Sequence, residues 1–334
     1  MKLKEIGEFG FIERFAHRFE DLITPPAMGI GDDCAILPAD DQYDYVITTD
    51  MLVEDIHFMR SKISPFNLGH KALAVNLSDV AAMGAHPIGS FLSVAIPTTI
   101  EVEYLDELME GYHQLSDKYH LPLMGGDTTR SPHKLIINIS VIGKIAKNQS
   151  RLRSMACESD IIAVTGFLGD SATGLQILLD EIKGPDYQTG YFKMCHNRPQ
   201  PAVDEGQWLG VQPGVHAMMD ISDGIASDLK HILKASKKAG TINLDQLPIS
   251  PQLMEFSEQK HLNRINLAIS GGEDYQLLLT VDAARFSEVA DGFTTRFNKP
   301  LYPIGQIQSG KPGITYLQNG RPTVVTGSGF NHFV

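Results

Sequence analysis

Six aspartates are the residues of this sequence best suited to chemistry, because each stands beside glycine or hydroxyl residues or at the end of an apolar run. They are Asp33, Asp50, Asp79, Asp127, Asp220 and Asp223, and Thr48, Thr49 and Ser222 add neutral oxygen donors. Two carboxylates suffice for general acid/base work, whereas six in one place would repel one another unless cations lay among them. Carboxylate and hydroxyl oxygens suit Mg²⁺ better than Zn²⁺. Several magnesium ions that bridge a polyphosphate would supply the missing charge.

Phosphate binding is also indicated by glycine pairs at 125–126 and 271–272, whose backbone N–H groups can approach anionic oxygens. Arg130, Arg151 and Arg153 are candidates for bidentate pairing with phosphates. The common nucleotide-binding motifs are nevertheless absent: the sequence has no P-loop, no protein-kinase motif set and no complete dinucleotide fingerprint. Ser171 lacks the surroundings of a serine-hydrolase nucleophile. A less common ATP-binding fold is therefore required.

Apolar patterning predicts the elements that position these residues. The run Tyr45-Val46-Ile47 predicts a short buried strand with Thr48, Thr49 and Asp50 at its carboxyl end, the edge where open α/β sheets bind ligands. Residues 67–84 predict an Ala- and Leu-rich helix with Asp79 facing inward. Phe11, Phe15 and Phe19 recur at helical spacing and predict a first helix that packs through them.

A polar, basic segment at 146–159 predicts a domain boundary. We expect an N-terminal ATP- and magnesium-binding domain over 1–147 and a C-terminal domain over 148–334 that contributes to the nucleotide and substrate site. Each half alternates strand and helix patterns and carries carboxylates where strands end. The pattern predicts a mixed α/β protein whose two α/β layers face one cleft.

Composition narrows the class of protein. The chain has 334 residues, 43% of them hydrophobic, and 28 basic against 40 acidic residues give a net charge of −12. That balance argues against nucleic acid or an anionic membrane as a partner. Its three cysteines form no CxxC pair, and we find neither a signal peptide nor an apolar run of transmembrane length. A cytoplasmic protein is expected.

The motifs, taken together and in order, resemble those of the thiamine-monophosphate kinase family. The resemblance rests on Gly-Ile-Gly-Asp-Asp-Cys-Ala at 29–35, Thr-Thr-Asp-Met-Leu-Val-Glu-Asp-Ile-His-Phe at 48–58, Ala-Val-Asn-Leu-Ser-Asp-Val-Ala-Ala-Met-Gly-Ala at 74–85, Gly-Gly-Asp-Thr-Thr-Arg at 125–130, Val-Thr-Gly-Phe-Leu-Gly-Asp-Ser at 164–171, Asp-Ile-Ser-Asp-Gly at 220–224 and Ser-Gly-Gly-Glu-Asp-Tyr at 270–275. It implies magnesium-dependent transfer of the ATP γ-phosphoryl group to thiamine monophosphate. It also implies the two-domain architecture of aminoimidazole-ribonucleotide synthetase (PurM-like), with an N-terminal sheet that forms a homodimer.

The resemblance also implies roles for individual residues. The positions that match metal ligands are Asp33, Thr48, Thr49, Asp50, Asp79, Asp127, Asp220 and Asp223. Those that match ATP contacts are Asp33, Gly126, Asp127, Arg153 and Ser222. Those that match the thiamine-phosphate pocket are Asp50, His57, Glu273 and Phe330. Arg151 is an alternative to Arg153, because residues 153–160 depart from the family pattern.

No catalytic base is expected in such a reaction, because an acceptor phosphate oxygen is already anionic near neutral pH. Glu273 would complement the cationic thiazolium, and Phe330 would stack on a substrate ring. Two other readings stay open at this point. One is a superfamily enzyme with a different acceptor, such as a ligase that makes aminoimidazole ribonucleotide, or a selenide-activating kinase, for which the expected N-terminal cysteine is absent from 1–28. The other is a partner protein that binds ATP without turnover.

Overall fold

The computed structural model describes residues 3–325 and divides its strands between two sheets. The first sheet holds β1 (Ala35–Pro38), β2 (Tyr43–Val53), β3 (His86–Pro97), β4 (Leu123–Ser131) and β5 (Ile136–Ala146), in the order β1-β2-β5-β3-β4. All neighbours are antiparallel except β3 and β4. β2 continues to Val53, so Thr48, Thr49 and Asp50 lie inside the strand, and the prediction that they stand at its carboxyl end is wrong.

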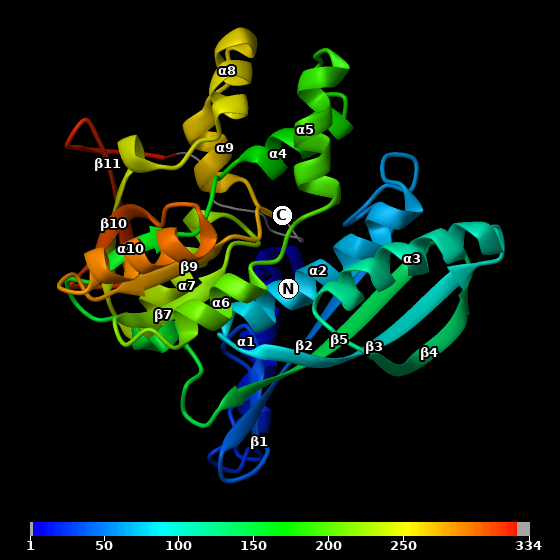
Figure 1. Ribbon diagram of the computed structural model, residues 1–334, viewed down its shortest axis with the longest axis horizontal. Helices are drawn as coiled ribbons and strands as arrows, with labels where there is room; N and C mark the ends of the chain where they lie inside the picture. The colour runs from blue at the N-terminus through cyan, green and yellow to red at the C-terminus, as the bar shows by residue number, and fades with distance from the viewer. Residues whose placement is uncertain (1–2, 326–334) are drawn as a thin grey trace.

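Two helices, α2 (Pro65–Ala82) and α3 (Val102–Lys118), cover one face of this sheet (Figure 1). Ser64 begins α2 as its N-cap, since its side-chain oxygen accepts a hydrogen bond from the Asn67 N–H at 3.2 Å, and Pro65 fills the first turn. The helices touch backbone to backbone through two glycines. A Cβ on Gly69 would lie 1.8 Å from the Leu108 carbonyl oxygen, and one on Gly111 would lie 1.8 Å from that of Phe66.

The second half of the chain contains a sheet of seven strands in the order β12-β11-β8-β10-β6-β9-β7. Its strands are β6 (Ile161–Val164), β7 (Val215–Asp220), β8 (Ala239–Asn243), β9 (Leu277–Val281), β10 (Tyr302–Gln308), β11 (Gly313–Gln318) and β12 (Arg321–Thr323). Its helices are α4 (Asp170–Leu178), α5 (Asp186–Asn197), α6 (Val203–Gly210), α7 (Ile225–Ser236), α8 (Pro251–Lys260), α9 (Arg264–Ser270) and α10 (Phe286–Phe297). Helices α4, α5, α8 and α9 gather at the top of Figure 1. β7 ends at Asp220, so the predicted strand end is confirmed there.

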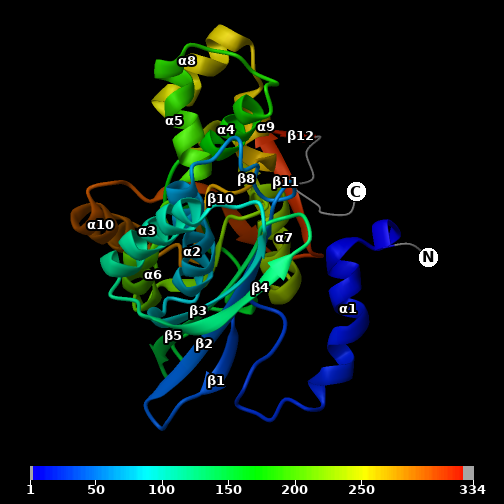
Figure 2. The same cartoon turned by 90° about the vertical axis from the view of Figure 1, so that its right-hand side faces the viewer.

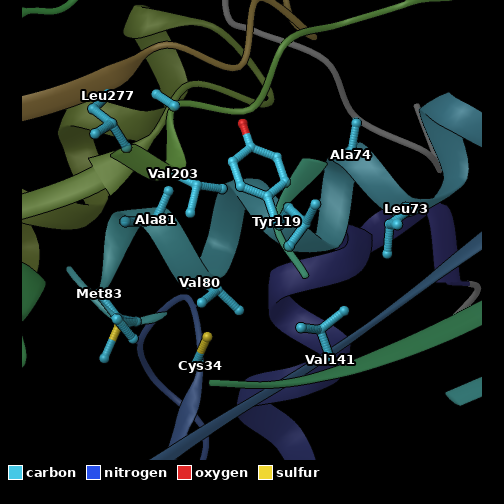
Figure 3. Packing of buried hydrophobic residues seen from close by; sticks show 14 of the residues in the cluster. Cys34, Leu73, Ala74, Val80, Ala81, Met83, Tyr119, Val141, Val203 and Leu277 are labelled. Atoms are coloured by element: carbon cyan, nitrogen blue, oxygen red, sulfur yellow. The ribbon is translucent and has the colours of Figure 1, made fainter. Parts of the chain in front are cut away.

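Helix α2 lies at the centre of a core that both halves share. Figure 3 shows Ala81 and Val80 of α2 between Val141 of β5 on one side and Val203 and Leu277 of the second half on the other. These side chains belong to one continuous hydrophobic cluster. The two sheets are therefore held to the same helix by apolar burial.

Helix α1 (Gly7–Glu20) stands to one side of the first sheet (Figure 2). Phe11 and Phe19 keep 49% and 55% of their surface exposed, so the prediction that this stripe packs into the chain is wrong for both residues. Short 3₁₀ turns occupy Leu3–Glu5 (η1), Arg153–Met155 (η2) and Leu244–Gln246 (η3). Within residues 3–325, every helix is too short or too polar to cross a membrane.

Candidate active site

Three carboxylates from distant parts of the chain converge in the cleft between the halves. Asp33 follows the Gly31 turn, Asp79 lies on α2 and Asp220 ends β7, and their ligand oxygens all lie within 4.8 Å of one another. Asp33 Oδ2 is buried without a hydrogen-bond partner. Buried polar atoms are normally paired, so this oxygen is available to a cation. We call Asp33, Asp79 and Asp220 the acidic triad.

Hydroxyl groups orient the other two members of the triad. The Thr48 hydroxyl donates a hydrogen bond to Asp79 Oδ2, and the Ser78 hydroxyl donates to Asp220 Oδ2 at 2.7 Å. Each carboxylate keeps an oxygen for another ligand. Ser78 was not predicted as a site residue, although its place beside Asp79, between Leu77 and Val80, was a signal.

Electrostatics indicate that the triad needs positive charge. Burial and the neighbouring carboxylates Asp50, Asp220 and Asp33 raise the pKa of Asp79 well above its ordinary value. Burial and the charge of Asp33 raise the pKa of Asp220 to about 8 and that of Asp50 to about 6. A divalent cation would remove this repulsion, and all the donor atoms are hard oxygens. The arrangement therefore fits Mg²⁺.

The alternation of β2 divides the three predicted residues between two faces of the sheet. Thr48 and Asp50 point toward α2, and the Asn76 side chain accepts a hydrogen bond from the Asp50 N–H at 3.1 Å. Thr49 points to the outer face, where its hydroxyl donates to the Ile139 carbonyl at 3.2 Å. The structure thus brings Asp50 near the triad and keeps the Thr49 side chain away from it.

Asp127 also lies apart from the triad. It pairs across the sheet with Ser93, which pairs with Asn138, which pairs with Met51 of β2. Asp127 therefore lies three strand spacings, about 14 Å, from β2, on the outer face with Thr49. It stands inside β4, so the prediction of a strand end is wrong for this residue as well. Gly126 has φ +153° and lines a separate cavity of about 480 Å³ beneath α3.

The two candidate arginines have different surroundings. Arg153 Nη2 lies 2.6 Å from Asp33 Oδ1, and the Arg153 N–H donates to Asp32 Oδ2 at 3.1 Å. The Arg151 guanidinium instead donates to the carbonyls of Gly210 and Gln212 at the end of α6. Arg153 is therefore beside the triad, and Arg151 stabilises a helix end.

A cavity of about 550 Å³ opens beside the acidic residues. Asp50, Asp79, Asp220, Ser222 and Asp223 are among its polar lining residues, and Leu52, Val75, Leu175 and Leu267 contribute apolar surface. The size suits a small organic molecule, and the mixed lining suits one that carries both polar and apolar groups. Glu8 of α1 also lines this cavity, although the sequence predicted only a packing role for that helix.

His57 faces the same cavity in a defined tautomer. Its Nδ1 accepts a hydrogen bond from the Val53 N–H at 3.0 Å. A ring nitrogen that accepts carries no proton, so neutral His57 holds its hydrogen on Nε2. The ring thus carries its donor at Nε2.

Glu273 lies on the cavity wall and is paired within the protein. Its Oε1 lies 2.9 Å from Lys71 Nζ, and its Oε2 lies 3.3 Å from His196 Nδ1. The sequence analysis missed Lys71 and His196. Lys71 could have been noticed, because it is a lysine inside the Ala- and Leu-rich stretch of α2. Nothing in the local sequence indicated a role for His196. Phe330 lies outside residues 3–325 and so outside the described structure.

Comparisons with known proteins agree with this architecture. Family models of the AIR synthase related proteins match the chain, the N-terminal domain over residues 31–145 and the C-terminal domain over residues 160–317. The two sheets are thus those of an AIR synthase related protein. Crystal structures of Escherichia coli HypE share this fold at 20% and 21% identity, with TM-scores of 0.69 and 0.70.

Closer relatives identify the particular family. The thiamine-monophosphate kinase of Bacillus subtilis (strain 168) is 36% identical, over 92% of this chain and 93% of its own length. That of Escherichia coli (strain K12) is 37% identical over 98% of both chains. A solved structure described as "AaThiL complexed with AMPPCP and TMP" has a TM-score of 0.85 and 32% identity, covering 99% of each chain. This chain belongs to the thiamine-monophosphate kinase family.

Proposed function

We propose that the protein transfers the γ-phosphoryl group of ATP to thiamine monophosphate and releases thiamine diphosphate and ADP. The observation that carries the proposal is the acidic triad, two of whose members, Asp79 and Asp220, line the 550 Å³ cavity, in a chain whose relatives are named for this activity. The carboxylates that line the cavity suit phosphates with their cations, and its apolar lining suits an organic acceptor.

Magnesium is the cation that the donor set supports. Asp33, Asp79 and Asp220 would hold it, with Asp50, Thr48 and Asp223 completing the set. Thr49 would join only through its main chain, because its hydroxyl points to the outer face. When bound, magnesium neutralises charge on the transferring phosphoryl group.

The protein itself would contribute position rather than a base. A phosphate acceptor has no proton to lose before in-line attack, so alignment and charge balance suffice. His57 can donate from Nε2 to an anionic oxygen in the cavity. Arg153 keeps a positive charge beside Asp33 at the triad, and Ser222 lines the cavity. These residues are the proposed nucleotide and acceptor contacts, with Glu273 on the wall.

In a homodimer, Asp127 could contribute to the site of the partner protomer. Tyr45, Met51 and Phe91 expose 38%, 53% and 39% of their surface on the outer face of the first sheet, which a second copy could cover. Asp127 and Thr49 lie on that face, away from the triad of their own chain. We propose that Asp127 of one protomer serves the nucleotide bound at its partner's triad, together with the neighbouring Gly126.

The activity is tested by incubating the protein with ATP, Mg²⁺ and thiamine monophosphate and measuring thiamine diphosphate by chromatography. A panel of other phosphate monoesters establishes the acceptor, and Asp79→Asn controls for contaminating kinases. Absence of thiamine diphosphate at every magnesium concentration would reject the proposal. ATP binding without any phosphorylated product would indicate a nucleotide-binding partner protein instead.

A further inference from the structure

Lys71 is a buried lysine that the proposed reaction leaves without a role. It lies on α2, its side chain is 1% exposed, and its Nζ lies 2.9 Å from Glu273 Oε1 and 3.3 Å from His196 Nε2. An ammonium group in such a place is costly unless it is paired. The folded structure therefore requires the ion pair between Lys71 and Glu273.

The donor pattern defines the state of the neighbouring histidine. Lysine only donates, so Nε2 of His196 accepts from Lys71 and the ring proton lies on Nδ1. That Nδ1 lies 3.3 Å from Glu273 Oε2 and 3.1 Å from the Ser171 hydroxyl. Burial and the charge of Lys71 lower the pKa of His196 to about 4, so the ring is neutral near pH 7. Glu273 is thus held at one oxygen by a cation and at the other by a neutral donor.

The backbone around Glu273 is held equally firmly. Glu273 has φ +62°, a conformation that costs energy for a residue with a side chain, and its N–H donates to the Ser222 carbonyl at 2.8 Å. The next residue, Asp274, accepts hydrogen bonds from the N–H groups of Gly169 and Ser171 at the start of α4. The main chain presents the carboxylate from a loop that is bonded on both sides.

The contacts among Lys71, His196 and Glu273 also join elements from both halves of the chain. Lys71 belongs to the helix that covers the first sheet, His196 to α5 and Glu273 to the loop between α9 and β9. The Glu273 side chain stays 26% exposed and lines the cavity. Burial opposes the charge on Glu273, but Lys71 and His196 outweigh it and lower its pKa. The carboxylate therefore stays ionised and faces the acceptor space.

We propose that Lys71 is a positioning residue of the acceptor pocket, which with His196 holds the Glu273 carboxylate in the one orientation that contacts the bound acceptor. The inference rests on the proposed function, in which Glu273 faces the acceptor. Lys71 would then affect acceptor binding by orienting Glu273, without contacting the nucleotide. Loss of Lys71 should therefore weaken acceptor binding and leave nucleotide binding intact.

The test compares Lys71→Met, Glu273→Gln and the double variant with the unmodified protein, by steady-state kinetics with each substrate varied in turn. We expect Lys71→Met to raise KM for thiamine monophosphate about tenfold or more, the range of one lost charge-assisted hydrogen bond. KM for ATP should stay within about twofold. The double variant should match Glu273→Gln alone in acceptor KM, since Lys71 has then nothing left to position.

Folding is controlled in the same series. The double variant removes both charges, so it leaves no unpaired buried ion and should unfold at a higher temperature than either single variant. It keeps the test decisive if a single variant fails to fold. Lys62→Met is the matched control, because Lys62 forms an exposed pair with Asp180 at 2.8 Å, and its acceptor KM should not change.

Three results would overturn the inference. They are an unchanged acceptor KM in Lys71→Met, equal increases of both KM values, and an acceptor KM in the double variant several-fold above that of Glu273→Gln. Failure of the proposed function is distinguished at the start, because the unmodified protein would then form no thiamine diphosphate.

Discussion

The separation of Asp127 from the acidic triad leads to a quantitative prediction about paired variants. Asp79 and Asp127 lie on opposite faces of the first sheet, with about 14 Å between β2 and β4. If Asp127 serves the partner's site, each site of a homodimer draws one of these aspartates from each protomer. Asp79→Asn and Asp127→Asn should each lower kcat about a hundredfold or more, because each would remove a carboxylate from the proposed magnesium and phosphate site.

A dimer containing one copy of each variant would then regain activity. One of its sites would carry both substitutions and the other would carry none, so it should show about half of the unmodified rate. A random mixture of protomers, in which about half of the dimers are mixed, should reach about a quarter. The two variants can be co-expressed with different affinity tags, the mixed dimer isolated by two successive affinity steps, and ADP release measured.

The matched control combines Asp79→Asn with Asp50→Asn. Asp79 lies on α2 and Asp50 points toward that helix, so both belong to the site of their own chain. Every site of that mixed dimer therefore carries a substitution, and activity should stay low. Absence of recovery in the Asp79 and Asp127 pair would refute the reasoning, since it would place Asp127 in the site of its own chain. Elution of the unmodified protein as a monomer would refute it as well.

Three further predictions follow from individual contacts. Ser78→Ala removes the 2.7 Å hydrogen bond to Asp220, so the magnesium concentration for half-maximal activity should rise about tenfold, and a magnesium titration that matches the unmodified protein would contradict this. Burial raises the pKa of Asp274 from 3.8 to about 8. The folded chain therefore keeps a proton that the unfolded chain loses, and stability should fall with rising pH across this window by at most about 1.4 kcal/mol per pH unit. Asp274→Asn should flatten that slope in urea unfolding at several pH values. Gly111→Ala sets a Cβ 1.8 Å from the Phe66 carbonyl oxygen and should destabilise the protein by about 1–3 kcal/mol in thermal unfolding, whereas Gly190→Ala, with open space around it, should not.

Sequence patterning predicted much of this site, and its failures have physical reasons. The inward face of Asp79 follows from helical periodicity, and the two-domain α/β class is confirmed by the fold and the family. Strand-end placement was wrong for Asp50 and Asp127, because β2 and β4 continue beyond these residues to Val53 and Ser131, past the apolar runs from which the strands were predicted. The period-two alternation of β2 could have separated Thr49 from Thr48.

Contacts between distant segments could not be predicted from local pattern. Lys71 and His196 are 125 positions apart, and no spacing rule relates them. The exposed phenylalanines of α1 show a similar limit, because helical periodicity identifies an apolar stripe without identifying what covers it.

The shared core around α2 has consequences for the unfolding of the protein and for its evolution. Because Val141, Val203 and Leu277 all pack near one helix, neither half keeps a complete interior when the other is removed. We expect a single heat-absorption peak in calorimetry, with equal calorimetric and van't Hoff enthalpies, despite the two sheets. Recombination that exchanged either half with a distant relative would also have to match the opposite surface of α2, so the halves are expected to be inherited as a unit.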